Sequence, residues 1–420
     1  MAIRVEDSTT VVPGFRFSGL AAGIKTTGRP DLALAVADQS VAAGGIFTTN
    51  FVRAAPVQVA ADHLAGGRAR AILVNSGCAN ACTGEAGLAA TRETIGAVAR
   101  ALGVPPREII PASTGVIGVT LPAARIVEHA PSLVAALSEH GADQFAEAIL
   151  TTDRGPKVAH ARGEIAGRPF VVMGIAKGAG MIHPHMAPLA PIAGRPKAGP
   201  SNANHATMLA FLFTDAAADA ALLAPALTRI ADATFHQASV DGDTSTNDTL
   251  VAMCSGRALG HFSSEPILAP PVEEAMTLVC EQLVRKIVAD GEGAEHLVEI
   301  HVSGVASNED AIRIARTIAT SSLVKTALYG QDPNWGRLLA AAGRAGIAFD
   351  PAHARVFVGG VAIVEGGIGL GAEREAAAHD AMALPSYRIE LVLGRGPGVG
   401  RYLTCDLGTG YVRCNADYRS

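Results

Sequence analysis

Thr207 is the residue of this 420-residue sequence whose type and position best suit covalent chemistry. A threonine hydroxyl inside a chain is a weak nucleophile. At a chain's N-terminus, the free α-amine, with a pKa of about 7.7–8.0, can act as its base. Thr207 could create that terminus by attacking the carbonyl of Ala206 in an N→O acyl shift, followed by hydrolysis of the ester. Taken alone, Thr207 is better explained as the start of a strand, because few threonines are catalytic.

The segment before Thr207 differs in texture from the rest of the chain. His183–His205 has no regular apolar periodicity and is rich in proline, with Pro184, Pro188, Pro191, Pro196 and Pro200. This composition predicts a long exposed loop. Long loops without secondary structure are uncommon inside compact domains and are usually functional or mobile. The sequence then switches abruptly to the strand-like Ala206–Phe211, which marks the Ala206–Thr207 bond as the candidate cleavage site.

Three other polar residues stand in glycine-rich surroundings. Thr114 is followed by glycines that suit a loop with inward-turned backbone N–H groups. Lys177 precedes two nearby glycines that allow close approach of a ligand, and Glu292 lies between two glycines just after an expected helix. Each also has an ordinary explanation: a turn threonine, a solvated lysine and an exposed loop carboxylate.

The elements that must position these residues alternate loosely between strands and helices. Short apolar runs, several rich in β-branched residues, predict strands at Ala71–Val74, Phe170–Ile175, Leu209–Phe213, Leu297–Val302, Val356–Val364 and Ile389–Leu393. Amphipathic spacing or end signals predict helices at Glu85–Leu102, Pro271–Asp290 and Asn308–Thr317. The glycine-rich stretches Gly366–Gly371 and Gly394–Gly400 are expected to be turns and close backbone contacts. Together the elements predict a layered α/β protein with mixed sheets.

Composition excludes several classes of function. A formal net charge of -5 and a pI of about 6.2 leave no basic surplus for nucleic acid. No run of 18 apolar residues occurs and the polar N-terminus has no secretory signal, so we expect a cytoplasmic protein with no membrane span. Cys78 and Cys82, or His183, His185 and His205, lack further ligands at suitable spacing, so no metal site is expected.

Nine motifs occur in order along the chain: Asn75–Gly84, Ser113–Gly118, Thr151–Asp153, Gly174–Pro184, Ala206–Ala216, Asp241–Asp248, Asp290–Ala294, Asp332–Arg337 and Asn415–Ser420. As an ordered set, these motifs resemble those of the ornithine acetyltransferase family. The resemblance runs from about Gly14 to the last residue. It implies a two-lobed layered α/β fold with mixed sheets, self-cleaved into chains 1–206 and 207–420, with 187–205 as an exposed processing loop. The family's usual assembly is an α2β2 heterotetramer.

The resemblance also implies roles for particular residues. Thr207 would be the self-cleaving nucleophile that carries the acetyl group, and Thr114 and Gly115 would form the oxyanion hole. Glu292 would bind the substrate amine and assist proton transfer. The substrate pocket would comprise Thr151, Lys177, Thr207, Glu292, Asn415 and Ser420.

The implied reaction is a ping-pong transfer of acetyl from N-acetyl-L-ornithine to L-glutamate in arginine biosynthesis. Some members also accept acetyl-CoA, and the sequence leaves this choice open. The ester on Thr207 conserves acyl-transfer potential, so no cofactor is expected. Two departures from the family, a longer segment between Met186 and Ala206 and Arg154 after the Thr-Thr-Asp motif, keep an alternative open. In that alternative, a paralogue acts as an N-terminal-nucleophile amidohydrolase or acyltransferase on another acylated amine.

Overall fold

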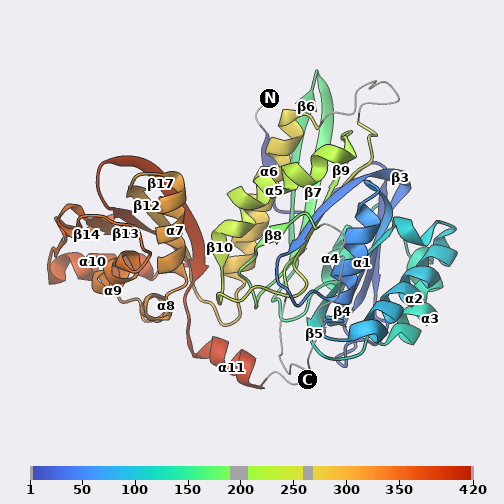
Figure 1. Cartoon of the computed structure of the whole chain (residues 1–420), viewed down its shortest axis with the longest axis horizontal. Coiled ribbons are helices and arrows are strands. Elements are labelled where there is room, and N and C mark those ends of the chain that lie inside the picture. Colours follow the sequence, from blue (N-terminus) through green and yellow to red (C-terminus); the bar gives the residue numbers. More distant parts are fainter. Residues whose placement is uncertain (1–2, 190–206, 259–267, 418–420) are drawn as a thin grey trace. The chain divides into compact units, whose positions relative to one another are not determined.

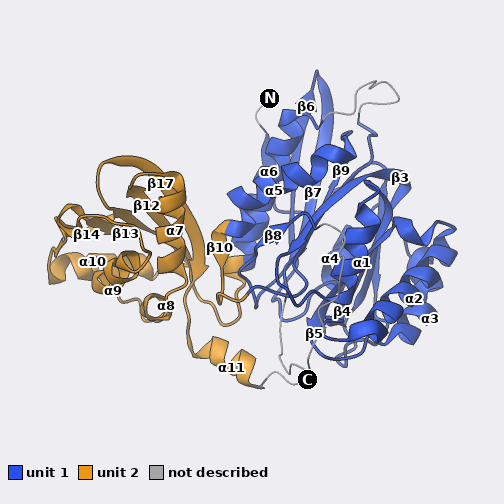
Figure 2. Ribbon diagram, viewed as in Figure 1, with its two compact units in different colours: residues 1–236, 244–287, 419–420 blue, residues 237–243, 288–418 orange. Residues whose placement is uncertain are grey.

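The computed structural model describes residues 3–189, 207–258 and 268–417 of the chain. It contains two sheets (Figure 1), and each has both parallel and antiparallel neighbours. The predicted α/β class with mixed sheets is therefore confirmed. The chain divides into two compact units (Figure 2): residues 1–236, 244–287 and 419–420 form unit 1, and 237–243 and 288–418 form unit 2.

Unit 1 is built on a ten-stranded sheet with the order β1-β6-β7-β9-β11-β3-β4-β5, and β2 and β8 also pair with β3. The strands are β1 Arg4–Glu6, β2 Phe15–Leu20, β3 Leu32–Thr48, β4 Arg68–Cys78, β5 Ile109–Val116, β6 Lys157–Ile165, β7 Arg168–Lys177, β8 Met186–Ala187, β9 Leu209–Thr214 and β11 Thr249–Cys254. Two neighbouring pairs, β9 with β11 and β4 with β5, run parallel. The strand that follows Thr207 is thus an inner strand of this sheet.

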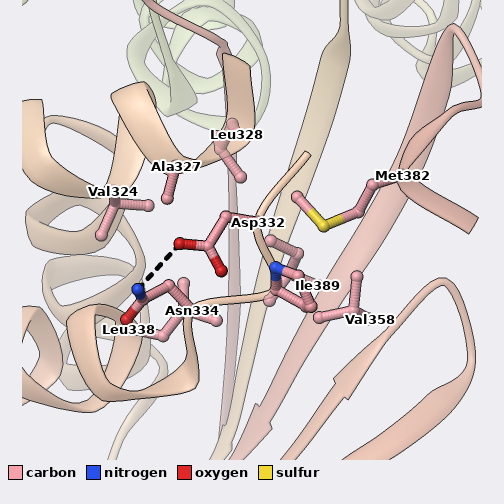
Figure 3. A pocket seen from close by; sticks show the side chains of 10 residues that line it. Val324, Ala327, Leu328, Asp332, Asn334, Leu338, Val358, Met382 and Ile389 are labelled. Carbon is pink, nitrogen blue, oxygen red and sulfur yellow. Dashed lines mark hydrogen bonds between the residues drawn. The ribbon is translucent and has the colours of Figure 1, made fainter. Parts of the chain in front are cut away.

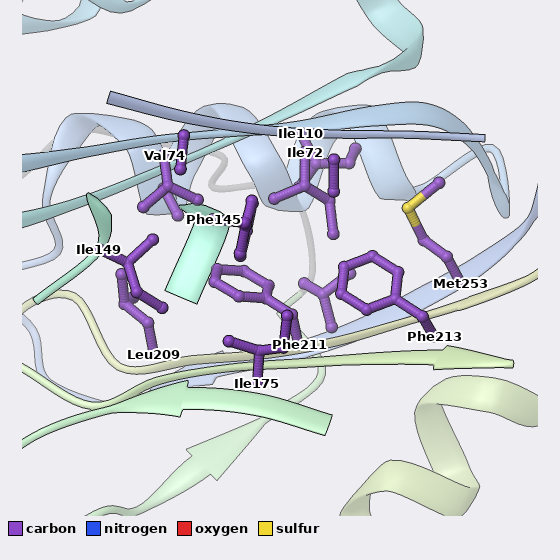
Figure 4. Packing of buried hydrophobic residues seen from close by; sticks show 14 of the residues in the cluster. Ile72, Val74, Ile110, Phe145, Ile149, Ile175, Leu209, Phe211, Phe213 and Met253 are labelled. Carbon is purple, nitrogen blue, oxygen red and sulfur yellow. The ribbon is translucent and has the colours of Figure 1, made fainter. Parts of the chain in front are cut away.

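The helices of unit 1 are α1 Ala55–Leu64, α2 Gly84–Leu102, α3 Ala123–Ala135, α4 Ala142–Ala148, α5 Ala220–Ala233 and most of α6 Pro270–Ala289. A large aromatic and aliphatic cluster fills the interior (Figure 4). In it, Phe145 on α4 meets Phe211 on β9 edge-on at 5.8 Å, and Phe17 on β2 meets Phe213 at 4.9 Å. Every residue of β9 is buried. Because interiors are close-packed, this cluster holds β9, and with it the position of Thr207, firmly in place.

Unit 2 contains a seven-stranded sheet with the order β10-β17-β12-β16-β13-β14-β15. Its strands are β10 Ala238–Ser239, β12 Leu297–Gly304, β13 Arg355–Val358, β14 Val361–Glu365, β15 Ile368–Gly369, β16 Ser386–Val392 and β17 Gly396–Cys405. Its helices are α7 Asn308–Ala319, α8 Ser322–Tyr329, α9 Trp335–Gly343, α10 Ala372–Met382 and α11 Thr409–Asp417. A second buried cluster, including Ile314, Leu338 and Tyr402, forms its own core.

Asp332–Arg337, one of the motifs that carry the family resemblance, has a structural role in unit 2. Asn334 caps α9 by accepting a hydrogen bond from the Arg337 N–H at 3.1 Å, and its Nδ2 donates to Asp332 Oδ2 at 2.9 Å (Figure 3). Asp332 and Asn334 border a small pocket that is otherwise lined mostly by aliphatic side chains such as Leu328 and Ile389. The motif therefore shapes a turn and a helix start.

Two sequence predictions on unit 2 are wrong. Val356–Val364 is not one strand but the hairpin β13–β14, because Gly359 and Gly360 adopt φ values of 56° and 83° between its arms. The stretch Gly394–Gly400 lies mostly inside strand β17 rather than in turns. Its expected close backbone contacts do occur, since a Cβ on Gly396 would lie 2.1 Å from the Val305 carbonyl oxygen.

The remaining predicted strands and helices match to within a few residues. In the described ranges, no helix is long and apolar enough to cross a membrane.

Candidate active site

Thr207 is 2% exposed and lies two residues before Leu209, the first residue of β9. Its hydroxyl oxygen lies 2.7 Å from the Ser245 hydroxyl oxygen, and either group can be the donor. Ser245 is fully buried, and its Oγ also accepts a hydrogen bond from the Asn247 N–H at 3.2 Å. The candidate nucleophile thus has a buried hydroxyl partner that the sequence did not assign.

Strand register explains why these two residues meet. β9 and β11 run parallel with Leu209 opposite Thr249, so the segments that lead into the two strands lie next to each other at the N-terminal ends of these strands. The backbone N–H of Met208 donates to Asp248 Oδ1 at 3.1 Å, which ties the two entering segments together. The pairing of β9 with β11 is therefore what brings Thr207 into contact with Ser245, which is distant in the sequence.

Lys177, at the end of β7, joins two further predicted site residues. Its ammonium is 0% exposed and donates to Thr114 Oγ1 at 3.1 Å and to Thr151 Oγ1 at 2.8 Å. Lys177 also stands opposite Leu209 in the β7–β9 pairing, two residues from Thr207. The structure therefore brings Thr114, Thr151 and Lys177 into direct contact close to the start of β9.

Thr114 and Gly115 lie at the end of β5 rather than in a free loop. They pair with Ser76 and Gly77 of β4, where both glycines have positive φ, 130° at Gly115 and 102° at Gly77. A Cβ on Gly115 would lie 2.4 Å from the carbonyl carbon of Gly77, so only glycine fits there. Asn247 Nδ2 donates to the Ser113 carbonyl at 2.9 Å, which links this strand end to the Thr207–Ser245 pair.

Asp153 is a second residue that sequence reasoning did not assign. Its side chain is 0% exposed; its Oδ1 accepts from Lys157 Nζ at 2.7 Å, and its Oδ2 lies 3.6 Å from Lys177 Nζ. Burial alone would raise the pKa of the Asp153 carboxyl, but the charges of Lys177 and Lys157 outweigh it and hold that pKa well below its usual range. Asp153 is therefore a buried carboxylate anion beside the candidate site.

Glu292 and Asn415 belong to unit 2 and contact each other. Asn415 Nδ2, on α11, donates to Glu292 Oε2 at 2.9 Å. The loop of Glu292 can lie this close to α11 because residue 293 is glycine: a Cβ on Gly293 would lie 2.1 Å from the Tyr411 nitrogen. The family resemblance assigns both residues to one substrate pocket, and that assignment stays a prediction.

The remaining predicted features fall outside this geometry. Ala206, residues 190–205 and Ser420 are not among the described residues, and of the expected processing loop Ala187 belongs to strand β8. Arg154 is exposed. Among the described residues, no group of three or more His, Cys, Asp and Glu side chains is placed to hold a metal ion.

The fold and the site together define a class: a mixed α/β protein with a candidate acyl-transfer site. In that site, a buried threonine–serine hydroxyl pair lies close to a lysine that donates to two more threonine hydroxyls. Comparison with known proteins specifies the class further: residues 16–420 match the model of the ArgJ family, and the chain belongs to that family. It is 45% identical to the arginine biosynthesis bifunctional protein ArgJ of Gloeobacter violaceus, over 99% of this chain and 98% of that protein. It is 42% identical to the protein of the same name from Geobacter sulfurreducens, over 97% of this chain and 100% of that one.

Among solved structures, the chain is similar to ornithine acetyltransferase from Mycobacterium tuberculosis in complex with ornithine. The identity is 40%, the match covers 44% of this chain and 100% of that chain, and the TM-score is 0.42. Family membership confirms the predicted resemblance. It also confirms that the chain is an enzyme and that its reaction class is acetyl transfer in arginine biosynthesis.

Proposed function

We propose that this enzyme transfers acetyl from N-acetyl-L-ornithine to L-glutamate through an ester on Thr207, after the chain cleaves itself between Ala206 and Thr207. The observation that carries the proposal is the 2.7 Å contact between the buried hydroxyls of Thr207 and Ser245. Covalent acyl transfer needs a base for the proton of the nucleophile, and in this proposal Ser245 relays the proton of Thr207 to the α-amine that cleavage frees. A cytoplasmic location and an α2β2 assembly are parts of the same proposal.

The chemistry balances with the residues present. Thr207 Oγ1 attacks the acetyl carbonyl carbon, and its proton passes to the α-amine freed by cleavage, directly or through Ser245. The tetrahedral oxyanion is stabilised by Thr114 and Gly115; such a donor is worth about 2.7–4 kcal/mol. The C–N bond breaks, the proton moves to the departing amine, and ornithine leaves. The neutral amine of glutamate then attacks the carbonyl carbon of the ester, and the C–O bond to Thr207 breaks. The α-amine takes a proton from the glutamate nitrogen and returns one to Thr207 Oγ1, which restores the hydroxyl and releases N-acetylglutamate.

The sheet of unit 1 supports a cleaved enzyme that stays together. Strand β9, in the second expected fragment, pairs with β7 of the first fragment from Val172–Thr214 to Lys177–Leu209. Strand β11, also in the second fragment, pairs with β3 of the first. Cutting the chain before Thr207 would leave these inter-strand hydrogen bonds in place, so we expect the fragments 1–206 and 207–420 to remain associated.

Within this proposal, Glu292 and Asn415 bind the amino group of the amino-acid substrate, and Thr151, Lys177 and Ser420 are further substrate-binding residues. The carboxylate of Glu292 has the charge to attract an ammonium group, and Asn415 fixes its orientation through the 2.9 Å hydrogen bond.

The test is a two-product assay. The purified protein is mixed with N-acetyl-L-ornithine and L-glutamate, and ornithine and N-acetylglutamate are quantified by mass spectrometry. Transfer gives the two products in equal amounts. Ornithine without N-acetylglutamate would instead favour the amidohydrolase alternative. A parallel reaction with acetyl-CoA as donor decides whether the enzyme uses a second acetyl source.

Variants of the nucleophile complete the test. Thr207→Ala should abolish both products and leave one uncut band on a denaturing gel, whereas Thr207→Ser should retain part of both activities. Thr317→Ala is the matched control, because Thr317 is half-buried on α7 and, among the described residues, its hydroxyl donates only to the Arg313 carbonyl at 2.8 Å. Cleavage at the same bond in Thr207→Ala would show that another protease cuts the chain.

A further inference from the structure

The buried carboxylate of Asp153 interacts with four groups: the ammonium groups of two lysines and two backbone N–H groups. These groups come from β6, from the end of β7 and from the loop before Asp153. Beyond the two lysines, Asp153 accepts hydrogen bonds from the backbone N–H of Gly178 at 2.6 Å and of Thr151 at 3.0 Å. The first fixes the end of β7 just after Lys177, and the second fixes the loop that carries Thr151. One side chain therefore holds in place both Lys177 and one of its hydroxyl partners.

The hydrogen bonds of Lys177 determine the direction of the hydrogen bonds that follow. A protonated lysine has three N–H donors and no acceptor. The hydroxyl oxygens of Thr114 and Thr151 must therefore accept from Lys177, at 3.1 and 2.8 Å. The hydrogen of each hydroxyl then points away from Lys177. Both threonines become donors toward the remaining space, which is the polarity that an oxyanion or a carboxylate requires.

A neutral Lys177 amine would remove this constraint. It would carry a lone pair and could accept from a threonine, which would turn the hydroxyl hydrogen away from the substrate. Burial disfavours a charged lysine, whereas a neighbouring anion favours it. The charged groups that act on Lys177 include the carboxylate of Asp153, whose Oδ2 lies 3.6 Å from Lys177 Nζ, and, from the loop before β3, the cation Lys25. The negative charge of Asp153 favours the protonated form of Lys177, whereas the charge of Lys25 disfavours it.

We infer that Asp153 is a positioning residue that keeps Lys177 protonated and thereby fixes Thr114 and Thr151 as hydrogen-bond donors to the reacting acyl group and the substrate. The inference rests on the proposed function, in which Thr114 stabilises the oxyanion. It adds a buried relay in which a carboxylate orders an ammonium, and the ammonium orders two hydroxyls. It also gives Lys177 a task inside the protein, in addition to the substrate contact proposed above.

The central variant is Asp153→Asn, which keeps the shape and an acceptor oxygen but removes the charge. We expect kcat to fall by about 100-fold at pH 8, with a smaller change in KM. We also expect a new loss of activity with rising pH, as Lys177 becomes neutral. A merely structural role would lower the rate by the same factor at every pH. A pH–rate profile parallel to that of the unchanged enzyme would overturn the inference.

A second measurement does not depend on the reaction. The lysine side chains are labelled with ¹³C at Cε, the Lys177 signal is assigned with Lys177→Arg, and its titration is followed by NMR. In Asp153→Asn the midpoint should move down by several pH units, to below pH 8, because a 100-fold loss of kcat at pH 8 requires most of Lys177 to be neutral there. An unchanged midpoint would overturn the inference. A shifted midpoint in a protein that makes no N-acetylglutamate would instead count against the proposed function and leave the relay standing.

Two further variants guard against misfolding of Asp153→Asn. Thr114→Ser keeps a hydroxyl that can accept from Lys177 and should retain most activity, whereas Thr114→Val removes it and should lose about 100-fold in kcat. Equal activity of these two variants would contradict a donor role for the Thr114 hydroxyl. Thermal unfolding of each variant, measured alongside, separates loss of rate from loss of fold.

Discussion

The hydroxyl oxygens of Thr207 and Ser245 lie 2.7 Å apart, and both residues are buried near the N-terminal ends of β9 and β11. Ser245 is held from two sides. Its Oγ accepts from the Asn247 N–H at 3.2 Å, and its carbonyl accepts from Thr48 Oγ1 at 2.6 Å. A hydroxyl fixed in this way can orient Thr207 and pass its proton onward.

Replacing Ser245 by alanine should therefore slow both self-cleavage and acetyl transfer. Positioned proton transfer contributes about 10²–10⁴-fold, and the free α-amine of Thr207 can supply part of it, so we expect a drop of about 100-fold in kcat. Rates of ornithine release and of band conversion on a gel measure the two steps. Ser132→Ala, at an exposed position on α3, is the control. Full activity in Ser245→Ala would show that the serine contact has no part in the chemistry.

The close approach of β4 and β5 makes Gly115 a sensitive position. Alanine there would combine the strain of a φ of 130° with a Cβ placed 2.4 Å from the Gly77 carbonyl carbon and 2.6 Å from the Cys78 nitrogen. We expect Gly115→Ala to lose about 2–4 kcal/mol of unfolding free energy and most of its activity, because the proposed oxyanion hole must shift.

Gly103→Ala separates these effects. Gly103 also has positive φ, 69°, at the end of α2, but among the described residues no atom beyond its own chain neighbours lies within 4 Å of the position a Cβ would take. Only backbone strain remains, so this variant should lose about 1 kcal/mol and keep its activity. Denaturant unfolding and the acetyl-transfer assay, done on both variants, make the comparison. Similar losses in the two would contradict a specific role for the β4–β5 contact.

The elements of the site could be predicted more readily than its connections. Apolar runs located β7 and β9, and amphipathic spacing located α2, because these signals are local. Thr114, Thr151 and Lys177 were assigned through family motifs, not through any pattern that brings them together. Their contact depends on the order in which β5, β7 and β9 enter one sheet.

The roles of Ser245 and Asp153 could not be predicted from the local sequence. Both lie inside motifs that carry the family resemblance, yet each is an ordinary loop residue by composition and spacing. Ser245 meets Thr207 only through the β9–β11 register, and Asp153 meets Lys177 only through the fold of the loop before β6. Such roles arise from long-range strand pairing, which no periodicity along the chain encodes.

Unit 2 offers a prediction on substrate binding. If Glu292 holds the amino group of the substrate, Glu292→Gln should raise KM for N-acetylornithine by about 10- to 100-fold, since a hydrogen bond to a charged group is worth about 1.5–3 kcal/mol. Asn415→Ala should raise KM less, because it removes only the 2.9 Å hydrogen bond that orients the carboxylate. Steady-state kinetics of both variants, with Glu295→Gln in the same loop as control, test this. An equal effect in Glu295→Gln would point to general charge rather than to Glu292.

Lys25 provides a prediction on pH. Burial, partly offset by Asp31, lowers the pKa of Lys25 from 10.5 to about 8. The folded protein thus holds this proton less tightly than the unfolded chain does. Below pH 8 both states are protonated and the cost of burying the charge is fully present. From pH 8 to about 10.5 the folded state loses the proton first, so stability rises with pH relative to a variant that lacks the group.

Lys25→Met, which keeps the length of the side chain, should therefore be more stable than the unchanged protein at pH 7, and the difference should shrink by pH 10. The pKa difference alone would correspond to about 3 kcal/mol. Partial exposure of the side chain reduces the expected change to about 1 kcal/mol. Urea unfolding at pH 7, 8.5 and 10 measures it, with Lys25→Arg as a variant that stays charged throughout. A stability difference that does not vary with pH would show that Lys25 keeps its proton over this range.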